Sequence, residues 1–452
     1  MAEKIVSPGV FTNEIDQSFL PAAIAEIGAC IIGPTVKGPA LVPTVVTSFS
    51  DYQDKFGDVF KSGSNSFQFL TSHAAEQYLQ NSDTLTVVRI LDGAFSPATT
   101  NITTGSDSHN SGVAFKLTTL ADGSIMNNSG SGVMTGSNEI LLSGSRHNLR
   151  YEVSGINNKK GTFTLSIRRG DDTIKRKQVL ESFTGVNLDP NSTNYIGKAV
   201  GDQVQTVRTD ENGNPFLQLS GSFPRKSKFV RVSDILETVD YLDENGNVRV
   251  PAASASLPMS GSGSANGTFS GGGDGLSGFD ALGNQNGTLG STAVNFYENI
   301  SSQTQGYTPA TLVDANGGSS YAEALNLISN QDEYDINLIL VPGIISKEHT
   351  VIANKVIDVC EDRGDCFTIL DPVVYGKNVA DATAEADSKD SNYAAVYWPW
   401  VKVPDSQVAG SQRWVPPSVV LGGIYAFNDS VAHPWFAPAG LNRGGIDVAI
   451  QA

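Results

Sequence analysis

The chain has 452 residues, which is enough for about three domains of ordinary size and for a core that needs no disulfides. Its 30 Lys and Arg residues against 47 Asp and Glu residues give a net charge of −17, which disfavours nucleic acid or an anionic membrane as a partner of the whole surface. Three Cys residues are too few for a disulfide framework, and the sequence carries neither a secretory signal nor an apolar run of about 18 residues. We therefore expect an acidic protein that is made in the cytoplasm and does not insert into a membrane.

The first predicted feature is an extended N-terminal arm over residues 1–22, with a Pro-Gly turn near its start. An arm outside any periodic pattern either frays or docks on another surface. The candidate interface residues of this arm are Ile5, Val6, Ser7, Pro8, Gly9 and Val10.

Residues 23–93 contain predicted strands and helices in alternation, the order typical of an α/β layer. The strands are expected at 29–32, 42–48 and 85–91, and the helices at 51–56 and 66–80. A stretch rich in Ser, Thr and Asn, 94–109, is predicted to be a linker.

Alternating apolar and polar residues then predict antiparallel strands, most clearly at 162–168. We predict a β-rich middle domain that comprises 23–93 and 110–290. Within it, 256–290 is so rich in Gly and Ser that it should be a flexible surface loop.

Residues 291–452 are predicted to form an α/β domain. Its expected elements are a helix at 321–330, a strand at 336–341, a helix at 347–363 and a strand at 366–370. Two fully apolar strands joined by a helix indicate a parallel βαβ unit. The predicted fold class is therefore a multidomain α+β and α/β protein, with a βαβ-containing domain, a β-rich domain and an extended N-terminal arm.

Candidate catalytic and metal-binding motifs fail on their spacing. Asp-Glu-Asn-Gly-Asn occurs at 210–214 and 243–247, but neither copy has the Gly and Glu that complete a calcium loop, so both are predicted hairpin turns. Cys360 and Cys366 lack neighbouring zinc ligands and are predicted to be small buried side chains. We predict no enzymatic activity, no cofactor and no metal. A β-rich extracellular or surface enzyme, such as a glycosidase, is the alternative.

Two basic clusters interrupt the acidic composition. The first, which we take as candidate interface residues, consists of Lys159, Lys160, Arg168, Arg169, Lys175, Arg176 and Lys177. The second consists of Arg225, Lys226, Lys228 and Arg231. The first cluster lacks the aromatic side chains that stack on bases, whereas an acidic protein with basic patches suits docking between copies of itself. A solvated strand face is the alternative.

All four Trp residues lie between positions 398 and 435. Trp398 and Trp400 alternate about Pro399 and should face the same side, and they or Trp435 should pack on the helix predicted at 347–363. Because Val401 and Val403 continue the alternation, Trp400 is predicted to lie in the core, with an inter-subunit anchor as the alternative.

Residues 392–444 resemble the signature region of contractile-tail sheath proteins of myophages, especially the T-even-type branch. The matching motifs are Y-x-P-W-x-x-V at 397–403, V-P-P-S at 415–418, I-Y-A at 424–426 and W-x-A-P-A-G-x-N-R-G at 435–444. S-P-G-V at 7–10, G-P-T-x-x-G-P-A at 33–40 and L-x-V-V-R-I-L at 85–91 match in the same order.

Two departures from the family pattern stand out. Phe427-Asn428-Asp429 occupies the place where many members have Arg-Thr-Asp. Members also continue beyond N-R-G into a C-terminal domain that holds the inner tube, whereas this chain ends at Ala452. Compared with the family pattern, either the chain is a fragment or the C-terminal domain is absent for another reason.

The resemblance implies a structural virion protein that is assembled in the host cytoplasm. Such a subunit would polymerise as stacked six-fold rings around the tail tube and would contract to drive the tube through the host envelope for genome delivery. Its implied partners are copies of itself, the tail tube protein, the baseplate and the tail terminator, with no direct nucleic acid contact. The N-terminal arm would be a strand donated to a neighbour.

Overall fold

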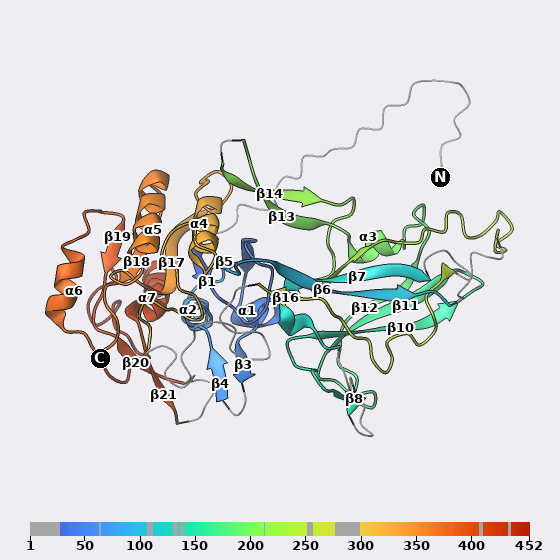
Figure 1. The fold of residues 1–452 in the computed structure, drawn as a ribbon, viewed down its shortest axis with the longest axis horizontal. Coiled ribbons are helices and arrows are strands. Elements are labelled where there is room, and N and C mark those ends of the chain that lie inside the picture. Colours follow the sequence, from blue (N-terminus) through green and yellow to red (C-terminus); the bar gives the residue numbers. More distant parts are fainter. Residues whose placement is uncertain are drawn as a thin grey trace.

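The computed structural model describes residues 28–62, 65–105, 112–129, 134–135, 140–211, 213–250, 256–275, 299–405, 410–432 and 435–452. The arm predicted over 1–22 lies outside these residues. Helices and a parallel sheet occupy one end of the elongated molecule, and antiparallel strands occupy the other (Figure 1).

The described residues form a six-stranded sheet at the α/β end, in the order β19-β18-β17-β1-β5-β2. Neighbouring strands run parallel, except that the edge strand β2 is antiparallel to β5. The bounds are β1 (Gly28–Gly33), β2 (Thr44–Val46), β5 (Leu85–Arg89), β17 (Ile336–Ile345), β18 (Phe367–Asp371) and β19 (Ala394–Val396). The predicted parallel βαβ unit is confirmed.

Helices cover both faces of this sheet, because alternate residues of its central strands point to opposite sides. Ala29 and Ile31 of β1 belong to one buried cluster, together with residues of α1 (Phe49–Phe56), α2 (Leu70–Tyr78) and α7 (Pro417–Val431). Cys30 and Ile32 belong to a second cluster, with residues of α4 (Gly318–Leu327) and α5 (Thr350–Arg363). The result is a three-layer α/β/α arrangement.

Local sequence signals set several helix ends. The Ser48 hydroxyl accepts a hydrogen bond from the Asp51 N–H and caps α1, which ends at Gly57 with φ of 71°. Gly364, also left-handed with φ of 72°, ends α5. Asp371, at the end of β18, accepts hydrogen bonds from the Ser418 N–H and hydroxyl, which ties the sheet to the start of α7.

The sheet divides the chain differently from the sequence-based division, which grouped 23–93 with 110–290. Strand β5 pairs with both β1 and β2, and β1 also pairs with β17, so the strands β1, β2 and β5 lie in the same sheet as β17, β18 and β19. All residues of β1 and β5 are buried, and strands buried on both faces need a layer on each side. The helices of the C-terminal half supply one of these layers.

The β-rich end consists of antiparallel sheets. One has the order β15-β7-β6-β16 and another the order β10-β11-β12, while β13 and β14 form a separate hairpin. The bounds of these strands and of helix α3 are β6 (Phe95–Thr103), β7 (Val113–Asp122), β10 (Leu149–Asn157), β11 (Thr162–Arg169), β12 (Val179–Asn187), α3 (Ile196–Val200), β13 (Val204–Thr209), β14 (Pro215–Ser220), β15 (Val230–Ser233) and β16 (Gly273–Asp274).

Parts of the segments predicted to be a linker and a flexible loop pack against the strands of this end. Most of the described part of the predicted linker 94–109 is strand β6, because its Thr-rich sequence alternates and buries Ala98 and Ile102 against β7. The predicted flexible loop 256–290 is described over 256–275, where Phe269 is fully buried and contacts the Tyr151 ring edge to face at 6.1 Å. Phe269 therefore anchors this part of the Gly-rich segment to β10.

The remaining elements are short. They are the hairpin β3 (Val59–Ser62) and β4 (Asn65–Gln68), the 3-10 turn η1 (Ser124–Met126), the pair β8 (Met134–Thr135) and β9 (Ile140–Leu141), helix α6 (Val379–Ala386) and the hairpin β20 (Val401–Pro404) and β21 (Gln412–Val415). Helix α6 lies at the extreme α/β end of the molecule (Figure 1).

Candidate functional site

Chemically reactive side chains in the described residues are dispersed or buried. Across these residues, no group of three or more His, Cys, Asp and Glu side chains could hold a metal ion. The three cysteines are buried and form no disulfide with one another, and a hydrogen bond with Cys366, together with burial, raises the pKa of Cys360. None of the described helices is long and apolar enough to cross a membrane.

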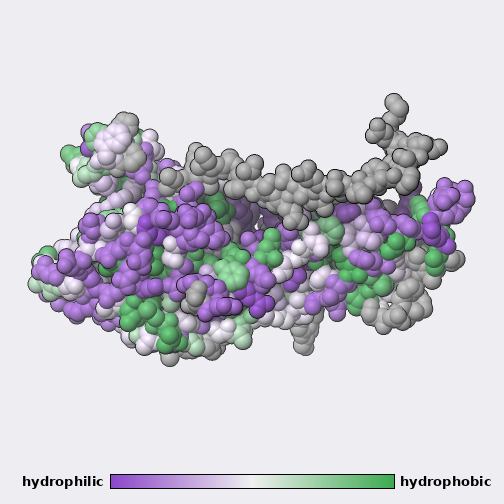
Figure 2. All heavy atoms as spheres, turned by 90° about the horizontal axis from the view of Figure 1, so that it is seen from above, coloured by the Kyte–Doolittle hydropathy of each residue, from purple (hydrophilic) through white to green (hydrophobic). Residues whose placement is uncertain are grey.

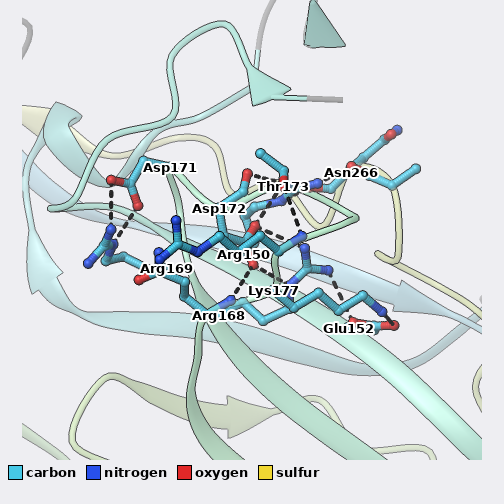
Figure 3. A network of polar contacts seen from close by, with 12 residues as sticks. Arg150, Glu152, Arg168, Arg169, Asp171, Asp172, Thr173, Lys177 and Asn266 are labelled. Atoms are coloured by element: carbon cyan, nitrogen blue, oxygen red, sulfur yellow. Dashed lines mark hydrogen bonds and ion pairs between the residues drawn. The ribbon is translucent and has the colours of Figure 1, made fainter. Parts of the chain in front are cut away.

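The first basic cluster does not form one free cationic surface. Arg168 is fully buried, and its guanidinium binds both carboxylate oxygens of Asp172, with N···O distances of 2.7 and 2.9 Å. Arg150 donates to the same carboxylate at 2.8 Å, and Glu152 binds both Arg168 and Lys177 (Figure 3). This network of Arg150, Arg168, Asp172 and Glu152 therefore holds β10, β11 and the turn after them together.

The other members of the cluster lie at the surface. Arg169 pairs with Asp171 at 2.5 Å, and both side chains are about one-third exposed. Five members are exposed, namely Lys159, Lys160, Lys175, Arg176 and Lys177. The predicted interface residues from Ile5 to Val10 lie outside the described residues.

The second basic cluster contributes to a cavity between the α/β end and the β-rich end. The cavity has a volume of about 320 Å³. Its cationic lining residues in the described chain are Lys37, Lys55, Arg225, Lys226 and Lys228, and Asp54 is the carboxylate among them. Lys37 follows β1, whereas the others come from α1 and from the segment before β15.

Lys37 is the unusual member of this lining. Its side chain is nine-tenths buried, yet within the described chain its ammonium forms no hydrogen bond or ion pair. Burial lowers its pKa from 10.5 to about 8, and the nearby Asp54 opposes this shift only in part. The neighbouring His147 adds no second positive charge, because burial lowers the pKa of its imidazole to about 3. Lys37 therefore presents to the cavity, at neutral pH, a charge that its neighbours compensate only in part.

We predict that Lys37→Met stabilises the subunit. Because the pKa of Lys37 is lower in the folded chain than in the unfolded chain, its protonation at pH 7 costs about 3 kcal/mol of unfolding free energy. The unfolded chain binds the extra proton between pH 8 and 10.5, so this cost diminishes as the pH rises through that window. Urea unfolding at both ends of the window measures the difference between variant and wild type.

The matched control is Lys55→Met. Lys55 lines the same cavity but is paired with Asp51 at 2.8 Å and donates to the Val45 carbonyl, so its removal should give no gain in stability. Equal gains from the two substitutions would contradict the assignment of an incompletely compensated charge to Lys37.

The tryptophans differ from one another in burial. Trp400 is 4% exposed and donates its indole N–H to the Val373 carbonyl at 2.9 Å, whereas Trp398 and Trp435 are 42% and 77% exposed. The expected packing on the 347–363 helix is not what the structure shows. Trp400 belongs to the buried cluster of α2 and α7, on the sheet face opposite to α5.

The sequence pattern revealed only part of this arrangement. It identified the basic segment 225–231, but it missed Lys37 and Asp172. The available signals were a Lys between two Gly-Pro turns after a buried strand, and a pair of acids that a single Gly separates from the paired arginines at 168 and 169.

Comparison with known proteins gives sequence similarity to tail sheath proteins. The tail sheath protein of Vibrio phage KVP40 is 26% identical over 160 residues, which cover 29% of this chain and 24% of that protein. The tail sheath protein of Enterobacteria phage T4 is 26% identical over 144 residues, which cover 27% of this chain and 22% of that protein. The alignments thus span less than a quarter of either relative. No protein-family model matches the chain.

Two solved structures align over most of the chain. A sheath tail protein from Listeria innocua gives a TM-score of 0.43 at 10% identity and covers 90% of this chain and 57% of its own. A sheath tail protein from Desulfitobacterium hafniense gives a TM-score of 0.40 at 11% identity and covers 98% of this chain and 66% of its own. The resemblance to tail sheath proteins that the sequence motifs predicted is confirmed by the two phage relatives.

Proposed function

We propose that the chain is a structural subunit of a phage contractile tail sheath, which polymerises around the tail tube and contracts to drive the tube through the host envelope. The observation that carries this proposal is the sequence similarity to the tail sheath proteins of two phages. The role is mechanical rather than catalytic, and it requires a firm body with surfaces that bind other copies.

The packing of the subunit supports such a role. The three layers around the parallel sheet form a body in which the central strands are buried on both faces. A close-packed body of this kind transmits force with little internal deformation. In the proposed mechanism the subunits move against one another, and the free energy of contraction resides in their contacts.

The proposed partners follow from the same assignment. Copies of the chain would form six-fold rings that stack helically around the tail tube protein, between a baseplate and a tail terminator, in a virion assembled in the host cytoplasm. The arm residues from Ile5 to Val10 and the exposed lysines 159 and 160 are proposed contacts between copies. The acidic net charge of −17 disfavours direct contact with nucleic acid.

Electron microscopy of the purified chain tests the proposal. We expect rings or tubes of uniform diameter to appear in negative stain as the protein concentration is raised, because head-to-tail contacts between identical subunits propagate. Particles of monomer size under all conditions, including with the cognate tail tube protein present, would contradict a sheath function.

A further inference from the structure

The cationic cavity has the properties of a docking site for carboxylates. Five cations line it against one carboxylate among the described residues, and the side chain of one of the five, Lys37, is largely buried. The segment that supplies Arg225, Lys226 and Lys228 is exposed at these positions. An excess of cations around a cavity, one of them on a largely buried side chain, favours an anionic occupant.

A dense acidic surface lies elsewhere on the molecule, on the turn before β17, on the last turns of α5 and on the turn before β18. We call it the acidic face. Its exposed carboxylates are Asp332, Glu333, Asp335, Asp358, Glu361, Asp362 and Asp365. Figure 2 looks down on the side of α4 and α5 and shows mainly hydrophilic residues over the α/β end.

A buried arginine holds the segments of the acidic face together. Arg363 is 5% exposed and donates to the Ile328 carbonyl at 2.6 Å and to the Tyr334 carbonyl at 2.8 Å, and it also binds Asp365. The turn before β17 is thereby fastened to the C-terminal end of α5. The acidic face is therefore a fixed surface rather than a set of independent side chains.

The acidic face is electrostatically unfavourable within the isolated subunit. Asp358, Glu361 and Asp362 occupy the last two turns of α5, where the helix dipole favours cations. Their carboxylates also repel one another and those of the adjoining turn. A cationic surface placed against them would relieve both effects.

We propose that the cationic cavity of one copy of this chain receives the acidic face of a second copy. Of the possible anionic occupants, a second copy is favoured because the complementary surface is part of the same chain. This inference rests on the proposed sheath function, and it identifies the two surfaces that form one contact between subunits of the sheath.

The position of the two surfaces predicts the kind of assembly. Lys37 follows the C-terminal end of β1, whereas 332–335 and Asp365 precede the N-terminal ends of β17 and β18. Because these strands are parallel, the two surfaces lie at opposite edges of one sheet. A contact between opposite edges is head-to-tail, and such contacts produce rings or helical filaments rather than closed two-fold dimers.

Neutral substitutions test the contact. One double variant neutralises the cavity, Lys226→Gln with Lys228→Gln, and the other neutralises the acidic face, Glu361→Gln with Asp362→Asn. Because each double variant removes two charges from the contact, we expect each to weaken self-association about 10-fold, as measured by sedimentation equilibrium at low salt. Wild-type association should also weaken between about 0.05 and 0.5 M salt. The matched controls change exposed charges away from both surfaces: Arg249→Gln with Lys377→Gln, and Glu211→Gln with Glu244→Gln.

Mixing the two neutralised variants provides the decisive measurement. Each retains one intact surface, so an equimolar mixture should form 1:1 dimers that grow no further, whereas neither variant associates to this extent alone. Association of the variants equal to that of the controls, or a mixture no larger than its components, would overturn the proposal. Polymers that form normally from all variants would reject this contact and leave the sheath function standing.

A truncated chain distinguishes a second copy from one other possible occupant of the cavity. If residues 1–27 of the same copy fill the cavity, their removal should increase wild-type self-association by exposing the cations. That result would overturn the assignment of the site to a second copy.

Discussion

Replacing Asp172 by Asn should lower the free energy of unfolding of the β-rich end by about 3–5 kcal/mol. The Asp172 carboxylate is fully buried and binds Arg150 and Arg168, whose side chains are themselves fully buried. A neutral amide cannot compensate two guanidinium charges, and its N–H groups would face their donors. Chemical denaturation, monitored by hydrogen exchange of the backbone amides of β10 and β11, measures this loss of stability.

The same substitution should loosen a more distant segment. Arg150 donates to the carbonyls of Ala265 and Asn266, and Arg168 donates to the Ser264 carbonyl at 3.2 Å. Once the arginines lose Asp172, these backbone contacts lose their positioning. We expect faster amide exchange around residues 264–266 than in the wild type.

Asp171→Asn is the matched control for this prediction. Asp171 is adjacent in sequence and also binds an arginine, but its pair with Arg169 is about one-third exposed. Exposed pairs contribute about 0–1 kcal/mol, so this variant should unfold almost as the wild type does. Equal destabilisation by both substitutions would show that burial of the network does not govern its energetic effect.

Local sequence patterns predicted the βαβ unit well, since each of its elements is determined by nearby residues. The apolar run of β17 is too long and continuous for an exposed strand, and α5 has helical spacing with a Gly directly after it. The local pattern does not predict which strands pair with each other, because strand pairing depends on residues far away in the chain. Strand β1 pairs with β17 about 300 positions later, and no local signal in β1 specifies that pairing.

Buried charges explain why the site was predicted only in part. Arg168 alternates with apolar residues of β11 and was assigned to a surface cluster, but the turn after the strand folds Asp172 back onto its guanidinium. Lys37 is buried because the β-rich end covers the loop after β1. The burial of Arg168 depends on how the turn after β11 folds back, and the burial of Lys37 depends on segments far away in the chain. Neither can be deduced from the alternation of apolar and polar residues in one strand.

Replacing Trp400 by Ala should lower the free energy of unfolding of the α/β end by about 3–5 kcal/mol, since the substitution leaves a cavity the size of an indole. Trp400 is 4% exposed, meets the Tyr375 ring at 5.8 Å and donates to the Val373 carbonyl, so it joins β20 to the segment after β18. Its loss also leaves that carbonyl without its indole donor. A thermal melt monitored by near-ultraviolet circular dichroism measures the effect.

Trp435→Ala removes the same side chain from a surface position. Trp435 is 77% exposed, so its removal creates no buried cavity and should change the melting temperature little. A melt of the Trp400 variant that superimposes on the wild type would mean that the indole does not support the core. If that variant instead lost only self-association, Trp400 would be an anchor between subunits, and the burial of its ring against Tyr375 and Val373 would have to open on assembly.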